Sequence, residues 1–179
     1  MRPGRIDGCR YAEPLPPDVR LVEFSAPVTL LLDVLAWGLF HAGTGYLAHR
    51  FPARWLRRDW WFLTVRPAER GFYERAARIR RWKDRLPEAG AFFDGGVSKR
   101  RLSGRDLAAL ERFAVETRRA ELAHWMATAC APLFVFWNPW NAVVLMHLYA
   151  VAVNAPFIAV QRYNRLRIGS LVGRTVNRA

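Results

Sequence analysis

The chain has 179 residues and a formal net charge of +13 at pH 7, which favours an anionic partner such as a lipid headgroup or a phosphate-bearing substrate. Its hydrophobic content of 52% and its eight tryptophans argue against a soluble nucleic-acid-binding protein. Its two cysteines are far apart and its histidines lack the spacing of a zinc site, so neither a disulfide framework nor a metal or cofactor site is predicted.

Charge is unevenly distributed along the chain. Residues 122–160 contain no Asp, Glu, Lys or Arg, whereas residues 50–85 contain twelve basic and four acidic side chains. The segment 161–179 has five arginines and no acidic residue. This layout predicts an all-α integral membrane protein that forms a single membrane domain over residues 1–179. We expect about three transmembrane helices and a basic cytoplasmic juxtamembrane region.

The first predicted transmembrane helix covers residues 26–48. It is long enough to cross a bilayer, which needs roughly 20 mainly apolar residues. The alternative is a cleaved signal peptide, but its apolar core would be shorter, and arginines would precede it rather than follow it. Asp33 and His41 are the ionisable residues within this span, and they form either a functional pair or a structural one.

Residues 50–103 are predicted to form a basic region at the cytoplasmic membrane surface. The first part mixes Arg and Trp, as interfacial segments do, and residues 69–83 have the composition of a basic helix. By the positive-inside rule, this region and the arginine-rich end of the chain are cytoplasmic. Three spans then give a multi-pass cell-membrane protein with its N-terminus outside and its C-terminus in the cytoplasm.

The second long helix is predicted over residues 104–137, where it enters the membrane. Pro139 cannot donate a helical hydrogen bond, and Asn138 before it is biased away from the α region. The chain is therefore expected to turn here and to return as a third helix over residues 141–168.

Two ionisable residues, Glu121 and His124, interrupt an apolar stripe on the second predicted helix. At 100° per residue both lie close to the stripe centred on Leu110, and residues three apart are neighbours on a helix surface. One interpretation is a structural polar pair at the membrane edge. The other makes His124 a general base that Glu121 orients, with Glu116 and either Arg118 or Arg119 completing the network.

Polar residues also recur along one face of the third predicted helix, namely His147, Asn154, Gln161 and Arg165. Hydrogen bonding between helices is the structural alternative for the first two. The segment QRYNRLR, residues 161–167, lies just past the membrane. A positive-inside anchor explains its arginines, whereas a phosphate-bearing substrate such as acyl-CoA also explains the polar residues between them.

Three blocks, RWKDRLPEAG, ETRRAELAHW and YAVAVNAPFIAVQRYNRLR, occur in this order. Together they resemble the glycosyl-4,4'-diaponeurosporenoate acyltransferase family over about residues 78–168. The resemblance implies esterification of a sugar hydroxyl with a fatty acyl chain, in the last step of staphyloxanthin-type carotenoid synthesis. His147 does not match the family pattern. The residues that match it are Arg81, Trp82, Lys83, Glu116, Thr117, Arg119, Glu121, His124, Trp125, Asn154, Pro156, Gln161, Arg162, Tyr163, Asn164 and Arg165.

We predict roles for the polar residues of these blocks. The predicted catalytic residues are His124, Glu121, Glu116 and Asn154. The predicted substrate-binding residues are Arg81, Trp82, Lys83, Arg119, Gln161, Arg162, Tyr163, Asn164, Arg165 and Arg167. His124 would deprotonate the sugar hydroxyl of a glycosylated lipid, Asn154 or Gln161 would stabilise the oxyanion, and the basic residues would hold the phosphates of acyl-CoA. The alternatives are a non-catalytic scaffold of a lipid-modifying complex and an enzyme that acts on a polyprenyl-phosphate lipid.

Overall fold

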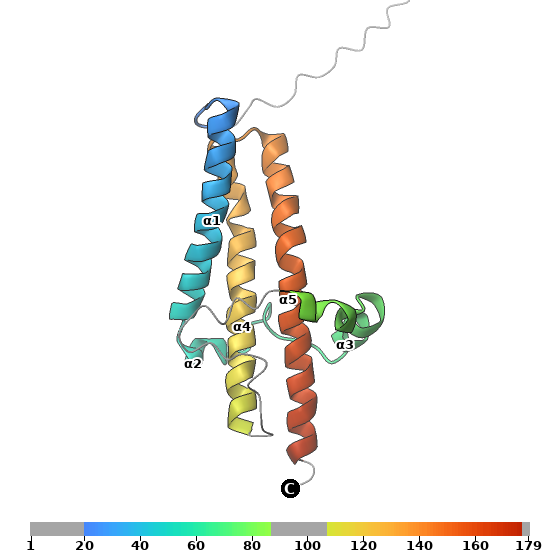
Figure 1. Cartoon of the computed structure of the whole chain (residues 1–179). Helices are drawn as coiled ribbons and strands as arrows, with labels where there is room; N and C mark the ends of the chain where they lie inside the picture. The colour runs from blue at the N-terminus through green and yellow to red at the C-terminus, as the bar shows by residue number, and fades with distance from the viewer. Residues whose placement is uncertain (1–19, 87–106, 177–179) are drawn as a thin grey trace, which may run out of the picture.

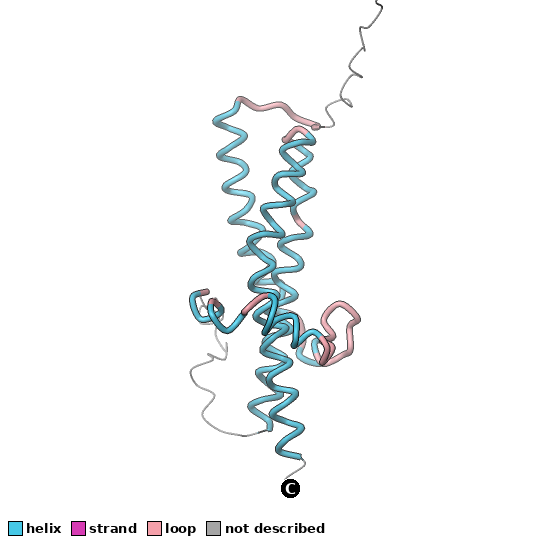
Figure 2. The backbone as a smooth tube through the Cα atoms, turned by 90° about the vertical axis from the view of Figure 1, so that its right-hand side faces the viewer, coloured by secondary structure: helices cyan, strands magenta, loops and turns pink. Residues whose placement is uncertain are grey.

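The computed structural model describes residues 20–86 and 107–176, and these parts of the chain are helical with no strand. Three long helices, α1 (Ala26–Arg50), α4 (Leu107–Ala129) and α5 (Trp140–Val176), lie side by side in both views (Figures 1 and 2). The predicted all-α fold class is confirmed for the described residues.

α1 begins with Pro27 in its first turn, where the missing backbone N–H has no helical acceptor to lose. It ends at Arg50, because Phe51 is extended and Pro52 cannot continue the helix. The prediction of a helix over 26–48 is therefore confirmed, with two further residues. Many of its large apolar side chains face outward, as do several on α5, including Leu30, Leu31, Leu35, Leu39, Leu145 and Leu148.

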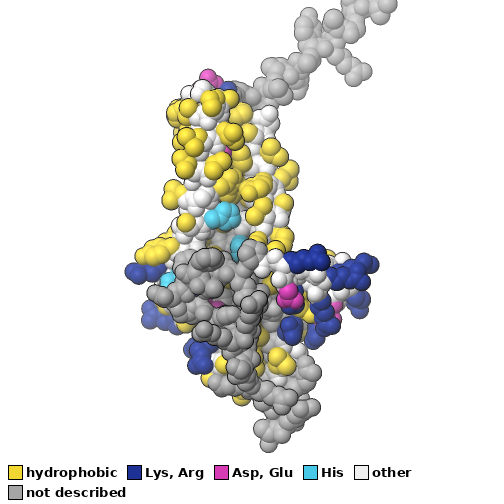
Figure 3. Space-filling model, viewed as in Figure 1, with side chains coloured by type: hydrophobic (Ala, Val, Ile, Leu, Met, Phe, Trp, Pro, Cys, Tyr) yellow, Lys and Arg dark blue, Asp and Glu magenta, His cyan; other side chains and the backbone are white. Residues whose placement is uncertain are grey.

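Within the described ranges, two helices are long and apolar enough to cross a membrane. They are α1 and the Trp140–Gly173 part of α5. α4 carries charged side chains from Glu111 to Glu121, which keeps this helix outside that class. Apolar side chains cover one end of the molecule, whereas Lys and Arg gather around the level of α2 and α3 (Figure 3).

The second long helix ends earlier than the sequence predicted. α4 ends at Ala129 rather than at residue 137, and the chain continues as one 3-10 helix, η6 (Ala131–Phe136). Pro132 is the reason, because it lacks the N–H that an α-helix would need there. The start expected at residue 104 lies outside the described residues. The helix expected over 141–168 begins one residue earlier and runs to Val176.

Asp33 on α1 anchors this connection. Its Oδ1 accepts one hydrogen bond from the Trp137 indole and one from the Asn138 side-chain amide, both at 2.8 Å. The carboxylate is buried, and these bonds tie the turn between η6 and α5 to α1. Of the two alternatives for Asp33, the structure supports the structural one. His41, the expected partner, is instead exposed beside the Trp37 ring.

The described residues between α1 and α4, 51–86, cross the long helices at the level where α1 ends (Figures 1 and 2). We call them the crossing segment. The single helix expected over 69–83 is wrong, because Arg78 has a positive φ of 46° that breaks any right-handed helix. Short elements take its place: α2 (Ala53–Leu56), α3 (Glu69–Gly71), the π-helical turn η1 (Phe72–Ala76), and the 3-10 turns η2 (Ile79–Arg81) and η3 (Lys83–Arg85).

Candidate functional site

The interface between α4 and α5 holds most of the buried polar side chains. The predicted stripe of α4 does face α5, since Leu110 and Phe113 pack against Ile168. Farther along the same face, Glu121 and His124 both form hydrogen bonds to residues of α5. Two polar centres result. We call Glu69, Glu121, Arg162 and Arg165 the ionic centre, and His124 with Asn154 the histidine centre.

Glu121 lies at the middle of the ionic centre and is 0% exposed. Its Oε1 accepts hydrogen bonds from Arg162 at 3.0 Å and from the Trp125 indole at 3.2 Å. Its Oε2 accepts from Arg165. A carboxylate removed from water requires such partners, because an unpaired buried charge costs several kcal/mol. Glu121 therefore binds α4 to α5 through two cations.

Arg162 links Glu121 to the crossing segment. It donates to both carboxylate oxygens of Glu69 at 2.9 to 3.1 Å, and to the backbone carbonyls of Phe62 and Thr64 at 2.9 Å. With its bond to Glu121, all three of its side-chain nitrogens have acceptors. Burial raises the pKa of Glu69, but hydrogen bonds from Arg162 and the Arg66 backbone outweigh it, so the pKa is lowered.

The histidine centre is built differently. The Nδ1 of His124 lies 2.8 Å from the Oδ1 of Asn154, and the ring stacks on Phe157 at 4.7 Å. The Nδ2 of Asn154 donates to the carbonyl of Ala150 at 2.9 Å, which fixes the amide orientation. Because Oδ1 can only accept, neutral His124 must carry its proton on Nδ1. The lone pair is then on Nε2, which is the tautomer that a general base needs.

The expected contact between Glu121 and His124 is wrong. Glu121 bonds to the two arginines and Trp125, and the residue that orients His124 is Asn154. The geometry also assigns Asn154 a different part from the expected oxyanion donor, because its Oδ1 faces the imidazole. The two polar residues on one stripe thus belong to two separate centres, one ionic and one built on a neutral hydrogen bond.

Glu116 and Arg119 lie away from the histidine centre. They form an ion pair at 3.0 Å, and the Nη1 of Arg119 donates to the carbonyls of Ala48, His49 and Phe51 at 2.7 to 2.8 Å. Ala48 and His49 lie in the last turn of α1, where carbonyls lack the usual helical partner, and Phe51 follows the helix directly. Arg119 therefore holds the C-terminal end of α1 against α4. Its guanidinium, which was predicted to bind substrate, is hydrogen-bonded to the protein itself.

Replacing Arg119 with methionine is expected to lower the free energy of unfolding by about 1.5–3 kcal/mol, because charged hydrogen bonds to the α1 carbonyls are lost. Equilibrium unfolding in detergent micelles measures it, and Arg54→Met, at an exposed position, is the control. If Arg119→Met instead leaves stability unchanged and raises the KM for an acyl donor, the predicted substrate-binding role is correct.

The other predicted substrate-binding residues divide by exposure. Tyr163 is buried, and its hydroxyl lies 2.9 Å from the Arg80 Nε and 3.2 Å from Glu74. Trp82 donates to the carbonyl of Ala77 at 2.8 Å, and Lys83 pairs with Asp84. Both therefore stabilise the crossing segment. The remaining members are the exposed Arg81 and Arg167, the half-buried Gln161 and the buried Asn164. Their binding roles stay predictions.

The sequence did not predict the contacts of Glu69, and Arg118, one alternative for the network with Glu116, has other partners. Glu69 was considered only as part of a basic helix, yet it pairs with Arg162 across 93 positions of sequence. Arg118 donates to the carbonyls of Leu56 and Arg58 at 2.7 and 3.1 Å, which holds the end of α2 against α4. No local pattern indicates either contact, because both depend on how the crossing segment folds.

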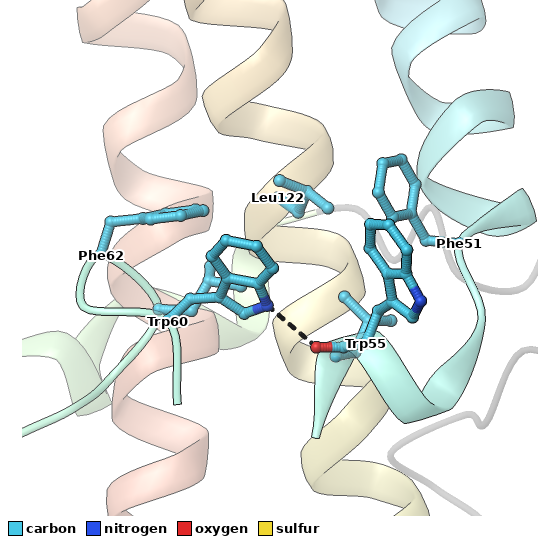
Figure 4. Close-up of a pocket in the computed structure, with 7 residues that line it drawn as sticks. Phe51, Trp55, Trp60, Phe62 and Leu122 are labelled. Atoms are coloured by element: carbon cyan, nitrogen blue, oxygen red, sulfur yellow. Dashed lines mark hydrogen bonds between the residues drawn. The ribbon is translucent and has the colours of Figure 1, made fainter. Parts of the chain in front are cut away.

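An apolar cavity of about 120 Å³ lies next to residues that bind the ionic centre. Figure 4 shows the side chains that line it. Leu122 lines it from α4, and because residues two apart differ by about 200°, it points away from the side of His124. The backbone carbonyls of Phe62 and Leu63, two other lining residues, bind Arg162 and Arg165. The ionic centre thus fixes the cavity wall. The lining residues are Phe51, Trp55, Leu56, Trp60, Phe62, Leu63 and Leu122.

Comparisons with known proteins found a matching family model and related sequences. The family model of glycosyl-4,4'-diaponeurosporenoate acyltransferase matches residues 52–174. A relative with that name from Staphylococcus haemolyticus (strain JCSC1435) is 35% identical over 92 residues, which cover 51% of this chain and 53% of the relative. Another from Staphylococcus aureus (strain N315) is 27% identical over 139 residues, which cover 76% of this chain and 83% of the relative. No solved structure matches the chain significantly.

The matched region leaves out α1 and includes both polar centres. It spans more than half of the 179 residues, and the resemblance seen in the three sequence blocks is confirmed. The chain belongs to the glycosyl-4,4'-diaponeurosporenoate acyltransferase family.

Proposed function

We propose that this protein transfers a fatty acyl group from acyl-CoA to a sugar hydroxyl of a glycosylated carotenoid lipid. The acceptor class comes from the names of the relatives, which are acyltransferases of glycosyl-4,4'-diaponeurosporenoate. The observation that carries the chemistry is the histidine centre, where Asn154 holds His124 with the Nε2 lone pair available.

In the proposed reaction, Nε2 of His124 accepts the proton of the sugar hydroxyl. The hydroxyl oxygen attacks the thioester carbonyl, and the tetrahedral intermediate collapses as the carbon–sulfur bond breaks. The thiolate of CoA leaves and takes the proton back from the imidazolium. Asn154 accepts the Nδ1–H bond throughout and is a positioning residue, while the exposed Arg81 and Arg167 remain available to the phosphates of the donor.

The protein is proposed to be a multi-pass cell-membrane protein with three spans. α1 and α5 are apolar enough, and the third span would be residues 122–129 at the end of α4 together with η6. The side chains of Lys and Arg gather at one level, beyond the apolar end (Figure 3). By the positive-inside rule this level faces the cytoplasm, with the N-terminus outside and the C-terminus inside.

Cysteine labelling tests this orientation. In a Cys9→Ser, Cys130→Ala background, Asn141→Cys is expected to react with a membrane-impermeant maleimide in intact cells. Arg81→Cys is expected to react only after the membrane is permeabilised. Labelling of Arg81→Cys alone in intact cells would reverse the orientation and remove the cytoplasmic acyl-CoA donor from the proposal.

Expression in a host that makes the glycosylated carotenoid but lacks this activity tests the function. The expected result is a new carotenoid lipid that is heavier by one fatty acyl group. His124→Ala, expressed to the same level, is the control and should not form it. An unchanged lipid profile with correctly inserted protein would contradict acyl transfer and favour the scaffold alternative, for which the ionic centre between α4, α5 and the crossing segment would be the supporting feature.

A further inference from the structure

The ionic centre is a chain of alternating charges that ends on an incompletely bonded cation. Glu69 pairs with Arg162, Arg162 with Glu121, and Glu121 with Arg165. Each of the two inner members lies between partners of opposite charge. Arg165 follows Glu121, and among the described residues no second carboxylate pairs with it.

Two of the three guanidinium nitrogens of Arg165 have no hydrogen-bond partner. Its Nη2 donates to Glu121 and to the carbonyl of Leu63 at 3.1 Å, while Nε and Nη1 donate to nothing. The residue is only 6% exposed. A buried N–H without an acceptor costs about 1–3 kcal/mol, and more on a charged group, so native proteins rarely leave one unpaired.

A second unpartnered donor is next to it in sequence. Asn164 is 7% exposed, and its Nδ2 has no acceptor either. Arg118 on α4 adds positive charge within electrostatic range of Arg165. The unpartnered atoms are all donors, and two of them belong to a guanidinium, so the group that suits them is an acceptor that carries negative charge.

We propose that Arg165 and Asn164 form a binding site for a phosphate ester. A phosphate offers more acceptor oxygens than a carboxylate, and the unpartnered donors belong to two side chains. Arg165 is eleven residues from Asn154 on α5, which corresponds to about 16 Å along the helix. The site therefore holds a part of the substrate that does not react. In acyl-CoA the pantetheine arm separates the phosphates from the reacting thioester. A phospholipid headgroup also carries a phosphate ester.

This inference deepens the proposed function but can be tested without turnover. Purified protein in detergent is titrated with inorganic phosphate at constant ionic strength, and the thermal unfolding midpoint is measured. A ligand that binds only the native state raises the midpoint. We expect such a rise, and an apparent affinity at least about tenfold weaker in Asn164→Leu, which keeps the side-chain size and removes the donor.

Arg165→Lys keeps the charge but removes Nε–H and Nη1–H, so it should also lose the phosphate effect. Arg57→Gln, at an exposed position outside the site, should keep it. If Arg165→Lys does not fold, the comparison of wild type with Asn164→Leu decides. No midpoint rise in the wild type, or the same affinity in Asn164→Leu, would overturn the proposal.

Two further arms identify the source of the phosphate. A midpoint rise with CoA, lost in Asn164→Leu, supports the acyl donor as the natural ligand. A rise with phosphatidic acid in the micelles, and none with CoA, supports a lipid phosphate. In the second case the site stands while the acyl-CoA part of the proposed function fails, so the two claims are separable.

Discussion

Replacing His124 with alanine is expected to lower kcat by about 10²–10⁴-fold, the usual contribution of a positioned general base. The imidazole stacks on Phe157 and bonds to Asn154, so its loss removes the only group of the histidine centre that can accept the hydroxyl proton. The measurement is acyl transfer per folded molecule, so that lower expression does not count as lost activity.

Asn154 and His147 provide the matched variants. Asn154→Leu removes the acceptor for Nδ1–H and should lower kcat, whereas Asn154→Asp keeps an acceptor there and should restore most of it. A purely packing role for Asn154 would not distinguish the two. His147→Ala, at an exposed position on α5, should leave kcat unchanged. Full activity in folded His124→Ala would show that this histidine is only a packing residue.

Replacing Glu121 with alanine is expected to lower the free energy of unfolding by about 3–5 kcal/mol, because the change leaves a buried guanidinium without its counter-charge. Glu121 is 0% exposed and neutralises Arg165, whose other acceptor is the backbone carbonyl of Leu63. Glu121→Gln keeps the shape and one acceptor oxygen, so its loss should be smaller. Equilibrium unfolding in detergent micelles gives both values.

Glu111, exposed on the same helix, is the control for this experiment. Glu111→Ala should change stability by no more than about 0.5 kcal/mol, as exposed substitutions usually do. If Glu121→Ala costs no more than Glu111→Ala, the ionic centre does not hold α4 to α5, and the partners described for Arg162 and Arg165 contribute little to folding.

The helices, and the faces by which they pack, could be predicted because they depend on the local pattern of apolar residues. The apolar run of α1 and the Asn138–Pro139 turn set two boundaries, and the 100° periodicity placed Glu121 and His124 on the face that meets α5. The break at Ala129 was missed because the apolar run continues through Pro132, so hydropathy alone shows no boundary there.

The partners of the site residues could not be predicted, because they depend on the tertiary arrangement. Two residues three apart on a helix can bond to each other, or each can bond across to a neighbouring helix. Glu121 bonds to Arg162, and the crossing segment brings Glu69 to the same guanidinium. His124 bonds instead to Asn154 on α5. Likewise, Arg119 was predicted to bind substrate, but its guanidinium donates to backbone carbonyls at the C-terminal end of α1.

Acyl transfer by the purified protein tests the central claim most directly. Wild type in micelles, supplied with a fatty acyl-CoA and a glycosylated carotenoid, is expected to release CoA and to form the sugar ester in equal amounts. His124→Ala, equally folded, should form neither at more than about 1% of that rate. Ester formed equally well by His124→Ala, or no CoA released and no ester formed by folded wild type, would contradict the account.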